Sequence, residues 1–216
     1  MKKLIIICEG YTELAFCKEI LVKHFENLNI TIEYELTDHS ISGGITKWVY
    51  LKEQIVRILS SEPSVFVTTL IDYYGIDKSH KFPKWANALA IENKPNRMEL
   101  LEMGMFEDLE NNFQFIPYIQ LHEFEAFVFS DYTVFENIYD DEDANLIGLK
   151  QICDEYPNPE DINNNIATAP SKRLQNNISR YNKVSSGIDL IREIGLPKIR
   201  VKCPRFHNWI SKLETI

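Results

Sequence analysis

The sequence feature that most constrains the fold is a short apolar run that ends abruptly in an acid and a glycine. Residues 5–8 read Ile-Ile-Ile-Cys, Glu9 and Gly10 follow, and a helical pattern starts directly afterwards. A buried strand, a tight turn and a helix N-terminus account for this order. Glu9 would then lie at the carboxyl end of the strand, and Glu13 in the first helical turn. In open α/β sheets, ligands bind at this edge.

The same order of strand and helix continues along the chain. The expected elements are strands at residues 3–8, 30–36 and 65–71, with helices at residues 12–28 and 48–59 between them. Thr12 is the expected N-cap of the first helix. The βαβαβ order predicts an α/β fold with a mainly parallel sheet and right-handed crossovers. A fourth strand is expected at residues 113–121, at an edge because Pro117 has no N–H to donate.

Acids follow two later strands in the same way as Glu9 follows the first. Asp72 ends the nearly continuous apolar run of the third strand, and Glu123 and Glu125 follow the fourth. Three segments would thus bring carboxylates to one edge of the sheet. Hard cations such as Mg²⁺ prefer carboxylate oxygens, so the pattern outlines a divalent-metal site. The alternative for each acid taken alone is a helix cap or a solvated loop position.

Glu123 and Glu125 are more informative than surface acids because they interrupt an apolar segment. A carboxylate in such a setting is costly unless a cation or a hydrogen bond compensates it. The two side chains share a face only if the backbone is extended, since they are two residues apart.

Length and charge indicate two parts. The chain has 216 residues, enough for a core domain at residues 1–130 with a helical C-terminal extension at 131–216 packed on it. Residues 131–161 contain ten acids and one lysine, which is typical of solvated helices and loops. Ser171 is the expected cap of a later helix. The net charge is −9, but residues 172–216 carry +7 and the first 171 carry −16. A basic C-terminal part favours nucleic-acid binding, and a solvated basic face is the alternative.

No apolar run approaches the roughly 18 to 20 residues that a membrane span requires, so no membrane partner is expected. The first apolar run is too short for a signal peptide, which favours a cytoplasmic protein. The four cysteines form no C-x-x-C pair, so they predict neither a zinc ribbon nor a redox motif. Cys8 and Cys17 are expected in the core.

The strand order and its acids resemble the Toprim domain of topoisomerases, primases and overcoming-lysogenization-defect nucleases. Residues 9–13, Glu-Gly-Tyr-Thr-Glu, resemble the E-G-x-x-E opening of the nuclease branch. Further segments resemble a bacterial Toprim-like family of undefined function, often encoded beside ABC-type ATPases in anti-phage loci. These segments are residues 69–75, 82–85, 122–126, 169–173 and 200–204. The resemblance covers most of the chain and implies a Toprim-like Rossmannoid fold with a four-stranded sheet.

The chain departs from the Toprim pattern at one position. The D-x-D motif after the third strand would have its second acid where Tyr74 stands, and Asp77 follows three residues later. Either Asp77 or the pair Glu123 and Glu125 can supply the missing ligand.

The leading hypothesis is a nuclease that depends on Mg²⁺ or Mn²⁺, cuts DNA, tRNA or another RNA, and acts in anti-phage defence. The expected catalytic residues are Glu9, Glu13, Asp72, His122, Glu123 and Glu125. Of these, the expected metal ligands are Glu9, Glu13, Asp72 and Glu125. The metal would polarise the scissile phosphate and activate water. Glu9 or Glu13 is the candidate general base, and His122 is either an acid or a structural hydrogen-bonding residue.

The expected phosphate contacts are Lys172, Arg173, Lys183 and Arg200. The second hypothesis is a non-catalytic, Toprim-like partner or regulatory subunit of an ABC-type ATPase. A third is a small phosphate-ligand binder that uses the loop at Gly43 and Gly44. A homodimer is compatible with any of them.

Overall fold

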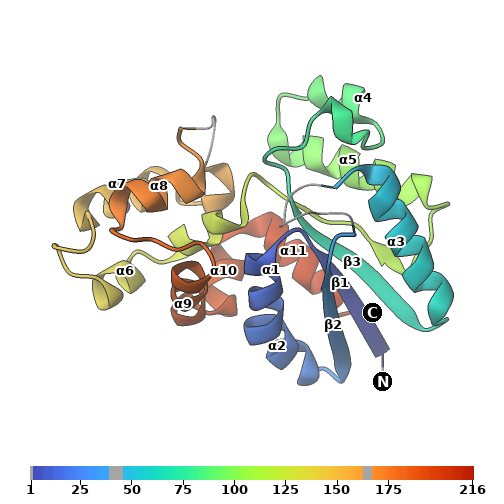
Figure 1. Ribbon diagram of the computed structural model, residues 1–216, viewed down its shortest axis with the longest axis horizontal. Helices are drawn as coiled ribbons and strands as arrows, with labels where there is room; N and C mark the ends of the chain where they lie inside the picture. Colours follow the sequence, from blue (N-terminus) through green and yellow to red (C-terminus); the bar gives the residue numbers. More distant parts are fainter. Residues whose placement is uncertain (1, 39–45, 163–166) are drawn as a thin grey trace. The chain divides into compact units, whose positions relative to one another are not determined.

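The computed structural model describes residues 2–38, 46–162 and 167–216 (Figure 1). The chain forms two compact units. The sheet unit consists of Met1–Leu121 and Lys212–Ile216, and the helical unit consists of His122–Ser211. The units divide after Leu121, whereas residue 130 was expected to end the core; the expected packing of an extension on the core stays a prediction.

The sheet unit alternates strands and helices. In chain order they are β1 (Lys2–Cys8), α1 (Tyr11–Phe16), the π-helical η1 (Cys17–Leu21), α2 (Val22–Glu26), β2 (Ile30–Leu36), α3 (Trp48–Ser61), β3 (Val65–Asp72), the 3₁₀ turn η2 (Lys78–His80), α4 (Trp85–Leu89), α5 (Lys94–Asp108), β4 (Phe115–Ile116) and β5 (Ile119–Gln120). The sequence patterns predicted the first three strands to within a residue. The strand order is β2-β1-β3-β4, β5 also pairs with β3, and all these pairings are parallel.

The expected fourth strand is in fact two short strands. β4 and β5 each pair with β3, and Pro117 and Tyr118 separate them. Pro117 cannot donate to a ladder, so the pairing is interrupted where it stands. The hydroxyl of Thr69 fills part of the gap: it donates to Tyr118 O at 2.8 Å, and Tyr118 N–H lies 3.0 Å from the same oxygen.

Helices cover both faces of the sheet, because the strands present apolar side chains to both. Ile5 and Ile7 of β1 pack in a core with residues of α3 and α5, among them Leu51, Ile55 and Met98. Leu4, Ile6 and Cys8 alternate with them, face the opposite side and are fully buried. Figure 1 shows α1 and α2 on one side of the strands and α3 on the other.

The helical unit contains the 3₁₀ segment η3 (Phe124–Ser130), α6 (Thr133–Ile138), α7 (Leu146–Glu155), the 3₁₀ turn η4 (Pro159–Asp161), α8 (Pro170–Asn177), α9 (Ser185–Ile194), α10 (Leu196–Lys202) and most of α11 (Pro204–Leu213). Its core is aromatic. Phe127 lies between Phe124 and Phe206, with ring centroids 5.3 Å and 4.5 Å away. This confirms the expected helical character of the C-terminal part.

Two predicted helix caps are wrong. Gly10 is the N-cap of α1, and Thr12 is buried inside that helix. Ala169 caps α8, with Pro170 in its first turn, and Ser171 is buried within the helix. In both helices the N-cap is a residue without a side-chain oxygen, Gly10 or Ala169. The hydroxyl of Ser171 donates to Glu123 instead.

Candidate functional site

The structure brings Glu9 and Asp72 together at the carboxyl ends of two neighbouring strands. Cys8 of β1 pairs with Leu70 of β3, so Glu9 and Asp72 follow at the same edge. The Glu9 N–H donates to Leu70 O at 3.1 Å, which extends the ladder beyond β1. The side chain of Glu9 then reaches β3, where its Oε2 accepts from the Asp72 N–H at 2.9 Å. Asp72 itself is buried, with 6% of its surface exposed.

Glu13 lies beside the same turn, four residues further on. It is in the first turn of α1 and is also 6% exposed. A Cβ added at Gly10 would stand 3.1 Å from Oε2 of Glu13, which is tighter than an ordinary contact. A glycine after Glu9 therefore leaves space for the Glu13 carboxylate to fold back against the turn.

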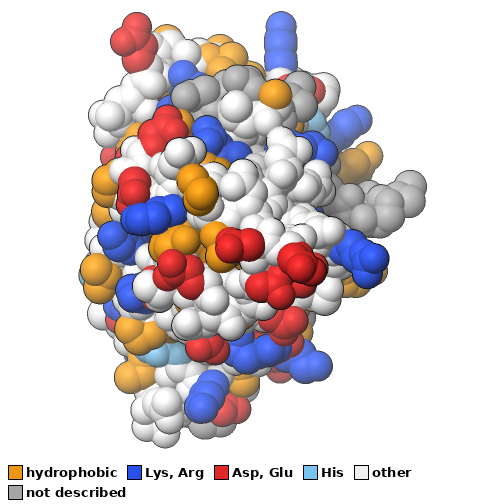
Figure 2. Space-filling model, turned by 90° about the vertical axis from the view of Figure 1, so that its left-hand side faces the viewer, with side chains coloured by type: hydrophobic (Ala, Val, Ile, Leu, Met, Phe, Trp, Pro, Cys, Tyr) orange, Lys and Arg blue, Asp and Glu red, His pale blue; other side chains and the backbone are white. Residues whose placement is uncertain are grey.

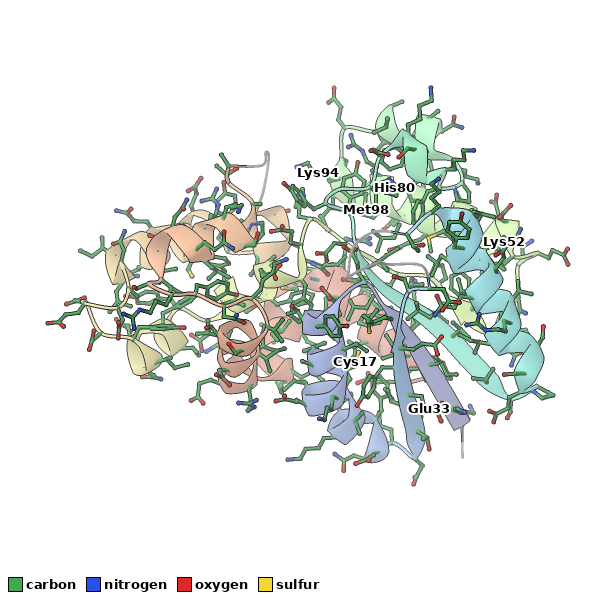
Figure 3. The ribbon with its side chains drawn as sticks, in the orientation of Figure 1. Cys17, Glu33, Lys52, His80, Lys94 and Met98 are labelled. Atoms are coloured by element: carbon green, nitrogen blue, oxygen red, sulfur yellow. The ribbon has the colours of Figure 1, made fainter. Side chains whose placement is uncertain are left out.

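Two buried thiols lie close to this turn, one directly before Glu9 and one in the helix that follows. Cys8 Sγ and Cys17 Sγ lie 3.6 Å apart and both side chains are fully buried, as predicted. Burial raises the pKa of the Cys8 thiol, and the hydrogen bond with Cys17 and the negative charge of Glu13 add to the shift. Cys17, which is labelled in Figure 3, also begins the π-helical turn η1. Such π-turns are rare and often occur at functional sites.

The donor set at this edge fits a hard divalent cation. Glu9, Glu13 and Asp72 offer carboxylate oxygens, the ligand type of Mg²⁺ and Mn²⁺. In the parts of the chain that the structure describes, no group of three or more His, Cys, Asp or Glu side chains is arranged to hold a metal ion. Mg²⁺ commonly uses one or two protein carboxylates, with water and substrate phosphates as its other ligands. Two carboxylates at the strand ends satisfy that requirement.

Tyr74 stands at the position of the second acid of the D-x-D pattern, and Asp77 was one alternative for the missing ligand. Tyr74 is half-buried in the turn after β3. Asp77 is exposed and caps η2, where its Oδ1 accepts from the Ser79 N–H at 2.7 Å and the Ser79 hydroxyl at 2.6 Å. These hydrogen bonds, together with His80, hold the pKa of Asp77 below its usual value. Asp77 therefore acts as a helix cap. The sequence pattern indicated it only as an alternative metal ligand.

Glu123 belongs to the helical unit and is held by α8. Its Oε2 accepts from the Ser171 N–H at 2.9 Å, and its Oε1 accepts from the Ser171 hydroxyl at 3.0 Å. Both residues are buried, with 4% and 6% of their surfaces exposed. A carboxylate that accepts a backbone N–H of a first helical turn also complements the helix dipole. Glu123 therefore acts as a cap for α8, delivered from outside that helix.

Glu125 is the most enclosed of the expected ligands, with 1% of its surface exposed. Its Oε1 lies 3.0 Å from Nζ of Lys183, whose side chain is 46% exposed. Burial raises the pKa of the Tyr181 hydroxyl, and the negative charge of Glu125 adds to that shift. His122 begins the unit, is 5% exposed and has a φ of 71°. The left-handed backbone at His122 is uncommon for a non-glycine residue and is typical of strained positions near functional sites.

The sequence patterns missed one buried acid. Glu160 was expected in a solvated stretch, but it is 1% exposed and accepts from the N–H groups of Arg205 and Phe206 at 2.9 and 3.1 Å. It thereby satisfies the N-terminus of α11, and burial raises its pKa. The local signs of an ordered turn are Asn158, whose side chain caps η4, and Pro159, which begins it.

Each expected phosphate contact has a partner inside the helical unit. Arg173 donates to Thr168 O at 2.8 Å and to Tyr156 Oη at 3.3 Å. Arg200 donates to His207 Nδ1 at 3.2 Å, Lys172 donates to Gln175 at 2.9 Å, and Lys183 pairs with Glu125 as described. On the face drawn in Figure 2, basic side chains are mixed with acidic ones. The expectation that these four residues bind phosphate stays a prediction.

Comparison with known proteins places the chain in a family. It belongs to the family described as Domain of unknown function (DUF4276), whose model matches residues 8–214. A solved structure, the C-terminal region of the Burkholderia pseudomallei OLD protein, is similar in fold. The TM-score is 0.50 at 17% sequence identity, over 98% of this chain and 97% of that one. No curated protein matches the chain significantly.

Within the described residues, the helices are all too short or too polar to cross a membrane. The loop with Gly43 and Gly44, on which the phosphate-binder hypothesis depends, lies outside the described residues.

Proposed function

We propose that the protein is a divalent-metal-dependent nuclease that hydrolyses phosphodiester bonds in DNA or RNA. The observation that carries the proposal is the pairing of Glu9 and Asp72 at adjacent strand ends, with the buried Glu13 beside them. The fold shared with the OLD C-terminal region and the Toprim-like E-G-x-x-E opening support it. A role in anti-phage defence belongs to the same proposal, since it depends on the resemblance to families found in such loci.

In this proposal each acid at the sheet edge has its own role. Glu9 and Asp72 would hold Mg²⁺ or Mn²⁺, and Glu13 would be the general base. A bound metal would polarise the phosphate and lower the pKa of a bound water. The protein contributes position: the hydrogen bond from the Asp72 N–H fixes one oxygen of Glu9, and Gly10 leaves room for Glu13. His122, Glu123 and Glu125 belong to the helical unit. Their expected part in the reaction stays a prediction, and the proposal does not depend on it.

The test is a cleavage assay with labelled single-stranded and double-stranded DNA and RNA, in Mg²⁺, in Mn²⁺ and in chelator. Glu9→Gln and Asp72→Asn should each lower metal-dependent cleavage by about 100-fold or more, because loss of even supporting residues of metal sites costs 10–100-fold. Glu33→Gln is a matched control, because Glu33 is a surface acid of the same unit that pairs with Lys3. Unchanged cleavage in both site variants would contradict the assignment.

One observation favours a second candidate function, a non-catalytic partner or regulatory subunit of an ABC-type ATPase. Tyr74 stands where the Toprim pattern has its second acid, and Asp77 is used as a cap. This candidate predicts no cleavage of any nucleic acid by the isolated protein and a stable complex with the ATPase. Co-purification with an ATPase encoded beside it, together with an inactive wild type in the cleavage assay, would support it over the nuclease.

A further inference from the structure

The connector between β3 and α5 is basic in an otherwise acidic unit. We call residues 73–97 the basic connector; it follows Asp72 directly and includes η2, α4 and the first turn of α5. It contains five Lys and Arg residues against two acids, whereas the rest of the sheet unit contains eight against sixteen. One of those two acids, Asp77, is already engaged by Ser79 and His80. Figure 3 labels His80 and Lys94 in this part of the molecule.

The basic connector is held firmly against the sheet unit. Phe82 is 3% exposed and its ring lies 5.8 Å from that of Trp48. The ring of Trp85 lies 6.2 Å from that of Tyr73. Arg97 donates to Tyr73 Oη at 3.0 Å and twice to the carbonyl oxygen of Ile91, at 3.0 and 2.7 Å. The connector therefore presents its side chains from a fixed backbone.

Two lysines of the connector have backbone angles that are costly for side-chain-bearing residues. Lys81 and Lys84 both have a φ of 56°, in the left-handed region. Such residues persist where the surrounding structure requires them, and they are frequent at ligand-binding segments. Lys84 is tied to Glu107 at 2.8 Å, whereas Lys78 and Lys81 are exposed. Two exposed lysines, Lys78 and Lys81, thus precede the buried Phe82 in the connector.

The connector lies beside the candidate metal edge. Phe82 and Glu9 line the same small cavity, together with Leu51 and Ile71. Half-buried aromatic residues stand at both ends of the lysine-containing stretch: Tyr74 comes two residues after Asp72, and Trp85 follows Lys84. Proteins that hold single-stranded nucleic acid combine a positive surface for the backbone with aromatic rings on which bases stack. The connector has both features within one rigid segment.

We propose that the basic connector binds a single-stranded stretch of nucleic acid, with Lys78 and Lys81 on phosphates and Tyr74 stacked on a base. The proposal rests on the nuclease function, because it places a substrate strand next to Glu9 and Asp72. It differs from the sequence expectation, which put the phosphate contacts in the C-terminal part of the chain. A flexible single strand suits this surface better than a duplex, because paired bases are not available for stacking on a side chain.

The experiment measures binding without cleavage. Fluorescence anisotropy of a labelled poly-pyrimidine oligonucleotide, as DNA and as RNA, is followed with the Asp72→Asn protein in chelator. We expect binding that weakens about tenfold or more when Lys78→Glu and Lys81→Glu are added. Replacing the same two lysines by Gln should reduce the slope of log K against log salt by about 1.4, since each phosphate contact contributes about 0.7. Tyr74→Ala should weaken binding about fivefold or more, and Tyr74→Phe much less.

The matched charge control is Lys18→Glu with Lys23→Glu, two exposed lysines on η1 and α2 of the same unit. Tyr50→Ala is the aromatic control, because Tyr50 is 37% exposed on α3. An equal loss of affinity in the control variants would overturn the proposal, and so would a duplex bound more tightly than the single strand. Absence of oligonucleotide binding would also overturn it, whatever the cleavage assay shows. Binding lost in the Lys78 and Lys81 variant, with Glu9 and Asp72 found dispensable for cleavage, would overturn the proposed function alone.

Discussion

Two groups of buried acids in this protein look alike in the sequence and differ in their partners. At the sheet edge, Glu9 accepts from the backbone of Asp72, whose own carboxylate is at the same strand end. In the helical unit, Glu123 accepts two hydrogen bonds from Ser171, and Glu125 lies against the ammonium group of Lys183. The first group brings carboxylates from two strand ends together, whereas the acids of the second group contact a helix terminus and a lysine.

The difference shows that burial alone does not identify a functional acid. A buried carboxylate requires compensation, and either the protein or a ligand can provide it. Glu123 and Glu160 illustrate compensation by the protein, because each accepts backbone N–H groups at the start of a helix. For Glu9 and Asp72, whose carboxylates come from separate strands to one edge, we propose that a metal ion provides it.

The largest expected effect is on cleavage activity, and it should appear in variants at the sheet edge. Glu13→Gln should lower metal-dependent cleavage by about 10-fold to 100-fold, because the side chain is beside the proposed metal. Gly10→Ala should lower it less, since the added Cβ would push on the Glu13 carboxylate from 3.1 Å. Single-turnover rates measure both effects. Full activity in Glu13→Gln would remove Glu13 from the site.

The next effect concerns stability and should appear in the helical unit. Glu123→Ala leaves the buried N–H and hydroxyl of Ser171 without their acceptor, and should lower the free energy of unfolding by about 3 kcal/mol. Ser171→Ala removes one donor only and should cost about 1 kcal/mol. Urea unfolding measures both. If Glu123→Ala unfolds at the same urea concentration as the wild type, the cap described here is not important for stability.

A smaller loss is expected for Lys183→Ala. Removing one partner of a buried pair leaves an uncompensated charge on Glu125. The cost should be about 1–2 kcal/mol, less than for a fully buried pair, because the lysine is half-exposed. Adding Glu125→Gln should restore much of the loss, since the amide carries no charge. A double variant less stable than Lys183→Ala alone would show that Glu125 has a further structural role.

The smallest effect is a pH dependence caused by Glu160. Burial raises its pKa above the ordinary value of 4.5. A carboxyl group with a raised pKa in the folded state contributes stability below its unfolded pKa, and loses that contribution as pH rises through the folded pKa. In Glu160→Gln this loss should be absent. Unfolding curves of both proteins between pH 4 and about pH 7 test this, and parallel pH profiles would contradict it.

Much of the sheet unit follows from the sequence because its signals are local. The apolar runs before Glu9 and Asp72 are the mark of strands covered on both faces, and the βαβαβ order requires a parallel sheet. Parallel strands end at one edge, so the meeting of Glu9 and Asp72 could be predicted from two segments 63 residues apart. Gly10 was recognisable as a turn, although its role as the N-cap was not.

The errors arose where a distant contact decides a local structure. Serine is a common cap residue, but α8 already begins at Pro170. The Ser171 hydroxyl donates to Glu123, which lies 48 residues earlier. Glu160 stands among solvated acids in the sequence. In the structure it is buried and accepts the N–H groups at the start of α11. The division of the fourth strand has a local cause instead, because Pro117 interrupts a segment that otherwise alternates well.

The most direct test of the account is metal binding, measured by titration calorimetry with Mn²⁺ in the presence of a short non-hydrolysable oligonucleotide. The proteins compared are wild type, Asp72→Asn and Glu123→Gln. The account predicts that the wild type binds the metal, that Asp72→Asn loses this binding, and that Glu123→Gln keeps it. Equal binding by wild type and Asp72→Asn, or no binding by the wild type, would contradict the central claim that the strand-end carboxylates form a metal site.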